Sequence, residues 1–339
     1  MGSSKRWLAL YLGAMVFMTA FGTSRLHLRA VATVNAFIYE GFVGGIAALS
    51  ELLSINDRRF NQAPDGVLWT NAYQEAVIFR RANRLDMARQ NILLAGQIAN
   101  RFSTDDLRWK ETLRERSAIE RELGAYDDAE SCLRVLLTVQ EMEGESLEMA
   151  ATLNGICSIL LQQAVHDDER VGRLLDRAEA IVRRLGGLHH PELATVFHNR
   201  AMVYHYRRRF AEAEALYRKA LEIRRGVLGD HSFVTAETFG DLGLLYGELG
   251  RVTLCVYFVE QAKKVYERSA GAGHPWIAWY AEQLGITYAK HGSFDEAARE
   301  FDEALQSRRR TLGNSHPLTI RSERLHAAVL RILKTRRSS

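Results

Sequence analysis

The sequence predicts an all-α protein in which an array of paired helices follows an N-terminal membrane helix. Three observations support this. Proline occurs 4 times in 339 residues, about a quarter of its usual frequency, which favours long uninterrupted helices. A pattern of small and large residues recurs through most of the chain. The chain also begins with an uncharged run that is long enough for a membrane span.

The uncharged run comprises residues 7–24, and Lys5, Arg6 and Arg25 flank it. As a helix rising 1.5 Å per residue it would be about 27 Å long, enough for a thin bilayer. We therefore expect an anchor that binds membrane lipid. A cleaved signal peptide is the alternative, because residues 20–22 include small side chains near a plausible cleavage site. Basic residues lie on both sides of the run, so they leave its orientation open.

A second apolar stretch, residues 30–50, contains only one charge, Glu40. We expect a helix that lies on the membrane or packs on the next domain, and a second span is the alternative. No acidic residue precedes Glu40, which is typical of mitochondrial import signals and favours the mitochondrial inner membrane over a bacterial envelope. The membrane region is thus residues 1–53, and residues 54–66 form a polar linker.

The charge of the chain argues against nucleic acid as a partner. The formal net charge is +4, and residues 1–50 contribute +3 of it, so the remaining 289 residues sum to +1. A nucleic-acid-binding domain would itself carry a basic excess. The three cysteines have no metal-ligand spacing and are too few for a disulfide framework.

The rest of the chain repeats itself. Residues 201–220 read AMVYHYRRRFAEAEALYRKA, and residues 285–304 read GITYAKHGSFDEAAREFDEA. Each has a small residue, an aromatic three later, an alanine nine after that, an aromatic four later and an alanine three later. The small residue of each second helix recurs at intervals of 41, 42, 42, 42 and 42: Ala88, Ala129, Val171, Ala213, Cys255 and Ala297. This spacing predicts six helix pairs.

This pattern closely resembles the tetratricopeptide repeat family, and the resemblance covers residues 67–334. A 42-residue period with linkers such as residues 312–317, Leu-Gly-Asn-Ser-His-Pro, is similar to the repeats of kinesin light chains. The resemblance implies a tetratricopeptide superhelix of about six helix pairs, each a helix–turn–helix. A final capping helix at residues 318–334 is expected to be polar outward. Residues 335–339 form a basic tail.

Prolines and histidines stand together at the expected starts of first helices, where a missing N–H costs nothing. The pairs are His190 with Pro191, His274 with Pro275, and His316 with Pro317. We interpret these histidines as helix-start residues, because equivalent positions of different repeats lie about 8–10 Å or more apart, too far to share a zinc ion. Arginines at 224–225 and 308–310 are expected to favour the negative ends of second helices.

No motif supports an enzyme or a cofactor. The sequence has no glycine-rich phosphate loop, no nucleophile elbow and no His-Glu-x-x-His. Residues 166–169, His-Asp-Asp-Glu, are interpreted as a solvated turn rather than a metal site. Cys255 is interpreted as a core residue, because it occupies a close-packed small position.

The resemblance also implies a concave groove that is lined by first helices and binds a peptide segment or a helix of a protein partner. In kinesin light chains, paired asparagines on these helices grip the peptide backbone. Asn199 matches that position here, whereas His198 and residues 240–241 and 282–283 replace the others. We expect Trp279 to be the main anchor and Asn199 the second, and the alternative is that Trp279 packs between repeats five and six. The implied groove residues are Thr195, His198, Asn199, Met202, His205, Tyr206, Glu237, Trp279, Glu282 and Ile286.

The sequence therefore predicts a membrane-tethered interaction scaffold or assembly factor that binds a protein partner in this groove. The alternative is a structural accessory subunit of a large membrane complex of the respiratory-chain or ATP-synthase type, with neighbouring subunits as its partners.

Overall fold

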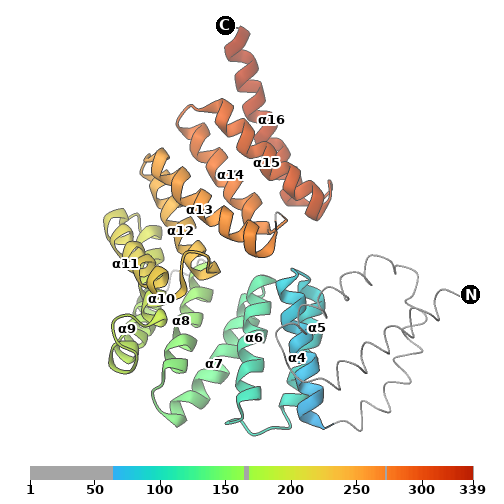
Figure 1. Ribbon diagram of the computed structural model, residues 1–339, viewed down its shortest axis with the longest axis vertical. Helices are drawn as coiled ribbons and strands as arrows, with labels where there is room; N and C mark the ends of the chain where they lie inside the picture. The colour runs from blue at the N-terminus through green and yellow to red at the C-terminus, as the bar shows by residue number, and fades with distance from the viewer. Residues whose placement is uncertain (1–63, 164–167, 272, 339) are drawn as a thin grey trace, which may run out of the picture. The chain divides into compact units, whose positions relative to one another are not determined.

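The computed structural model describes residues 64–163, 168–271 and 273–338, and every regular element in these ranges is an α-helix (Figure 1). The expected membrane region, 1–53, and nearly all of the linker lie outside the described residues. Among the helices that are described, none combines the length and apolar character needed to cross a membrane.

Thirteen helices follow one another within the described residues, and they pack as six consecutive pairs with a final helix against the last pair, as predicted. The pairs are α4 (Asp65–Arg81) with α5 (Leu85–Ala99), α6 (Leu107–Glu122) with α7 (Tyr126–Glu143), α8 (Leu147–Gln162) with α9 (Asp168–Leu185), α10 (Pro191–Tyr206) with α11 (Phe210–Leu228), α12 (Phe233–Glu248) with α13 (Val252–Ala270), and α14 (Pro275–Lys290) with α15 (Phe294–Leu312); α16 (Pro317–Ser338) packs on α15.

The third repeat departs from the regular spacing in its first helix. Second helices begin at residues 85, 126, 168, 210, 252 and 294, but first helices begin at 65, 107, 147, 191, 233, 275 and 317. The start of α8 is thus 40 residues after α6 and 44 before α10. The two offsets cancel, so the period of the second helices stays regular.

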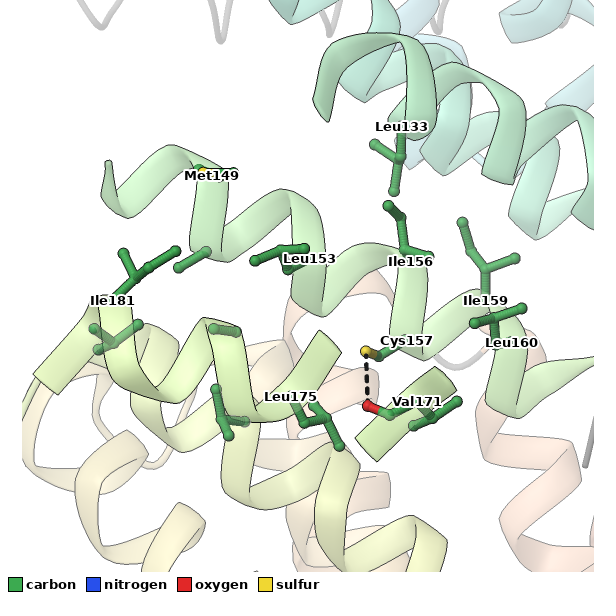
Figure 2. Close-up of a cluster of buried hydrophobic side chains, with 14 of the residues drawn as sticks. Leu133, Met149, Leu153, Ile156, Cys157, Ile159, Leu160, Val171, Leu175 and Ile181 are labelled. Atoms are coloured by element: carbon green, nitrogen blue, oxygen red, sulfur yellow. Dashed lines mark hydrogen bonds between the residues drawn. The ribbon is translucent and has the colours of Figure 1, made fainter. Parts of the chain in front are cut away.

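Small residues occupy the points where paired helices nearly touch. The backbone of Gly285 approaches Phe301 so closely that a Cβ atom would lie 2.7 Å from its ring. In repeat two the Ser117 hydroxyl donates to the carbonyl of Ala129 at 2.8 Å. Figure 2 shows the corresponding contact in repeat three, where the Cys157 thiol donates to the carbonyl of Val171 at 3.9 Å. Cys157 is therefore the contact residue of α8, and this contact fixes how α8 packs on α9.

The three histidines stand at helix starts, as predicted, and each caps its helix. The Nδ1 atom of His190 accepts the backbone N–H of Glu192 at 3.2 Å, and His274 does the same for Trp276 at 3.3 Å. His316 caps α16 through the N–H of Leu318 at 3.2 Å. Each bond satisfies one of the free N–H groups at a helix N-terminus. The predicted prolines follow at the first helical position.

The sequence predicts that the outer face of the last helix is polar, but in the structure this face also exposes aliphatic side chains. Of its aliphatic residues, Val329 is buried, and it packs in one cluster with Phe301 of α15. Four others are exposed on α16: Leu318, Ile320, Leu330 and Ile332. The end of the array therefore presents an apolar surface mixed with arginines.

Candidate protein-binding site on the first helices of repeats four to six

The ten predicted groove residues lie on α10, α12 and α14, but they differ widely in exposure. Tyr206 is the most accessible, with 61% of its surface exposed. Six are partly exposed: Thr195, Met202, His205, Glu237, Trp279 and Ile286. Three are buried: His198, Asn199 and Glu282. The buried three must be judged by their internal partners.

Two of the buried residues have structural partners that occupy their polar groups. The side-chain amide of Asn199 donates to the carbonyl of Asn154 at 3.1 Å, which joins α10 to α8. Glu282 accepts hydrogen bonds from Arg308 and pairs with Arg321 at 3.0 Å. Since both side chains are 2% exposed or less, these contacts hold repeats together and leave little for a partner.

Buried arginines connect each of two repeats to the next, which the sequence interpretation missed. Arg224 is 1% exposed, and its Nη1 donates to the carbonyl of Val234, at the start of α12, at 2.8 Å. Arg308, two repeats later, donates to the carbonyl of Leu318, at the start of α16, at 3.3 Å. The sequence places both at the ends of second helices but does not show that they are buried. Their separation of 84 residues, twice the period, was the available signal.

A group of carboxylates from α12 faces two histidines from α10. The Nε2 atom of His198 lies 3.2 Å from Asp241 Oδ2 and 4.0 Å from Glu237 Oε2. Two helical turns further along α10, His205 Nε2 lies 3.3 Å from Glu248 Oε1. These contacts form the seam between α10 and α12, and we call the five residues the His–carboxylate seam.

Electrostatics keep the Glu237 carboxylate of the seam ionised at neutral pH. Crowding by protein atoms alone would raise the pKa of Glu237, but the fields of His198 and Arg224 outweigh it and lower the pKa below its ordinary value. Burial, and then the negative charge of Asp241, raises the pKa of the Tyr206 phenol. The carboxylate of Glu237 is thus ionised and Tyr206 is protonated at physiological pH.

Trp279 is part of the protein's own packing rather than a free anchor. Its ring contacts Trp276 and Tyr280 edge to face, with centroids 5.1 and 5.0 Å apart, and it packs against the core of repeats four to six. These contacts agree with the alternative that Trp279 packs between repeats five and six. Trp276, at 45% exposed, is the more accessible tryptophan.

Gly240 occupies a groove position because Tyr280 fills the space in front of it. A Cβ atom at residue 240 would lie 2.0 Å from the Tyr280 hydroxyl oxygen. Tyr280 is 2% exposed, and burial raises its pKa well above the ordinary value.

Within the described part of the chain, no group of three or more His, Cys, Asp or Glu residues could hold a metal ion.

Comparisons with known proteins agree with this architecture. A family profile described as "Tetratricopeptide repeat" matches residues 148–226, 192–254 and 234–306. No curated protein matches the sequence. A chain of nearly identical TPR-like repeats from Podosopora anserina, described as of kinesin light chain type, is 19% identical, with a TM-score of 0.44 over 60% of this chain and 96% of that chain.

Two further solved structures are similar in fold. The Rap protein complexed with competence and sporulation factor is 11% identical, with a TM-score of 0.56 over 98% of this chain and 94% of that chain. A chain of the APC/C hetero-tetramer Cut9–Hcn1 is 12% identical, with a TM-score of 0.56 over 89% of this chain and 52% of that chain. At these identities the likeness concerns the fold.

Proposed function

The chain is a tetratricopeptide repeat protein, and on this basis we propose that it is an interaction scaffold that binds a protein partner along α10, α12 and α14. Stacked helix pairs present their first helices on one continuous surface, and such a surface suits an extended peptide or a helix. The scaffold role is supported by the family. The location of the site rests on the side chains below.

The observation that carries the proposal is a set of accessible side chains on consecutive first helices. Tyr206 is exposed at the end of α10, and Glu237, Asp241 and Glu248 are partly exposed on α12, with 46%, 24% and 42% of their side chains accessible. Interfaces concentrate their energy in a few anchors, and tyrosine is among the enriched types. Asn199 and Glu282, by contrast, support the scaffold from inside.

We also propose that residues 1–53 hold this scaffold at a membrane. The support is the uncharged run at 7–24, which has the length of a span. A tether would confine the scaffold and its partner to one surface, which raises their effective concentration and suits an assembly factor.

The test is affinity purification of the full chain from its native cells, followed by mass spectrometry. The wild type is compared with Tyr206→Ala/Glu248→Ala, and Glu222→Ala/Glu267→Ala, two exposed positions on α11 and α13, is the matched control. We expect the same proteins with the wild type and the control, and their loss with the site variant. Partners retained equally by all three would place binding elsewhere.

A structural accessory subunit is the second candidate, and the exposed aliphatic residues of α16 favour it. Leu330 and Ile332 are 47% and 40% exposed on the terminal helix, which another subunit could cover. Native electrophoresis separates the two functions. A subunit remains in one large complex at high salt, whereas a scaffold releases its partner.

A further inference from the structure

We propose that Glu237 and Asp241 receive a lysine or arginine side chain of the bound polypeptide, so that the partner segment is basic at this point. This inference rests on the proposed function, and it adds the chemistry of the partner. Four observations on the His–carboxylate seam support it.

The two carboxylates lie side by side and are accessible. They are four residues apart on α12, so they share one face of the helix. Their nearest polar neighbours are His198 Nε2, at 3.2 Å from Asp241 and 4.0 Å from Glu237, and Arg224 Nη1, at 3.7 Å from Glu237. Among the described residues, none of these contacts has hydrogen-bond geometry, so both carboxylates keep their acceptor capacity.

His198 is a buried side chain aimed at the same point. Its side chain is 3% exposed, and neither ring nitrogen has a hydrogen-bond partner among the described residues. Buried polar groups in proteins are nearly always hydrogen-bonded, so a buried imidazole that lies beside two carboxylates without a hydrogen bond leaves this point open to a further polar group. The N–H groups of an ammonium or guanidinium ion can pair with the two carboxylates beside this ring.

The charge balance of the seam favours a cation. Glu237, Asp241 and Glu248 contribute three negative charges on α12, while the histidines facing them are His198 and His205. Arg224, whose guanidinium lies 3.7 Å from Glu237, already directs Nη1 to the carbonyl of Val234 and the hydroxyl of Thr238. Arg121 on α6 contributes a weaker positive field at Glu237. An acidic side chain would be repelled here.

The neighbouring aromatic ring suits the same occupant. Tyr206 is 61% exposed, and it lies close enough to Asp241 for the carboxylate to influence its phenol. An aromatic face attracts ammonium and guanidinium groups, so Tyr206 can hold the side chain on the open side. A neutral segment bound at this point would instead cover two carboxylates without pairing them, which is unfavourable.

The experiment uses a displayed library of random 12-residue peptides, selected on the full chain at low salt. We expect the enriched peptides to share a lysine or arginine at one position. Synthetic versions should bind about tenfold more weakly to Glu237→Gln/Asp241→Asn, and about as tightly to the control Glu222→Gln. Replacing the shared basic residue by norleucine should weaken wild-type binding equally and leave the variant's affinity unchanged.

The outcomes separate this inference from the proposed function. Enriched peptides that lack a shared basic residue, or that bind the double variant as well as the wild type, would overturn the inference and leave the scaffold in place. If the peptides bind Tyr206→Ala as tightly as they bind the wild type, the proposed site on α10 and α12 is itself wrong. Circular dichroism verifies that each variant is folded.

Discussion

The hydroxyl of Tyr280 lies against the backbone of Gly240, so closely that a single added carbon at residue 240 would be 2.0 Å from the oxygen. The contact joins the first helices of repeats five and six. It explains why a position that the family resemblance assigns to a ligand-binding side chain has no side chain at all. The surface between α12 and α14 is shaped by the packing of Tyr280.

Gly240→Ala should therefore destabilise the protein by about 1–3 kcal/mol, because the methyl group forces Tyr280 out of its place. Gly226→Ala is the matched control. It also lies within a helix, its added Cβ meets nothing within 4 Å, and it should be neutral or slightly stabilising. Urea unfolding followed by circular dichroism measures both. Equal stability of the two variants would contradict the role assigned to Tyr280.

Glu282→Ala should cost about 3–5 kcal/mol, because it leaves the buried guanidinium of Arg308 without its counter-charge. Glu323→Ala breaks an exposed pair with Arg309 at 3.0 Å and should cost less than about 1 kcal/mol. The double variant Glu282→Leu/Arg308→Met should recover much of the loss. No recovery would mean that the packing of Glu282, rather than the buried charge, holds the repeats.

The stability of the protein should fall with acidification, in part through His274. Burial lowers the pKa of His274 below its ordinary 6.5, and its Nδ1 must be unprotonated to accept the N–H of Trp276. The unfolded chain thus binds more protons than the folded one below pH 6.5. This stabilisation is complete above pH 6.5 and is lost as the pH falls through the lower folded pKa.

His274→Asn tests this, since asparagine is a good N-cap and does not titrate. The melting temperature of the variant should decline less between pH 7 and pH 5 than that of the wild type. His231→Asn, at an exposed histidine, should retain the wild-type slope. Identical slopes for the wild type and His274→Asn would contradict the capping argument.

Trp279→Ala should lower the stability by roughly 1–3 kcal/mol, because the side chain is partly buried between Trp276 and Tyr280. Trp276→Ala, at a more exposed position, should cost less. Thermal melts of both variants, paired with partner affinity, measure the two roles of this aromatic group. A loss of affinity at Trp279 without loss of stability would restore it as a binding anchor.

Deletion of residues 1–25 should convert the protein from membrane-bound to soluble, because it removes the uncharged run at 7–24. Carbonate extraction of the full and truncated chains measures this. If the truncated chain remains in the pellet, residues 30–50 are themselves a membrane element.

The sequence was sufficient to predict the helix pairs, since the small residues that recur every 42 positions are the ones that the packing requires. It also predicted that His190, His274 and His316 stand at helix starts, because proline directly follows each of them. Trp279 and Glu282 were harder to interpret. Whether a polar or aromatic residue on a first helix faces a partner or a neighbouring helix depends on residues from other repeats, such as Arg308 and Tyr280.

The shifted start of α8 shows a second limit of the sequence interpretation. A two-residue loss before this helix and a two-residue gain after it cancel in the period of the second helices. The compensation becomes visible only when Cys157 is seen to contact Val171.

The position of α16 at the end of the array has a consequence for the order in which the protein unfolds. Every inner helix packs on a helix before it and a helix after it, whereas α16 packs chiefly on α15. In a linear array with nearest-neighbour coupling, a terminal unit has one interface fewer and opens at a lower free energy. Amide hydrogens of α16 should exchange first at this end, and protection should rise toward α12 and α13, so that cooperative unfolding spreads inward from the carboxyl-terminal helix.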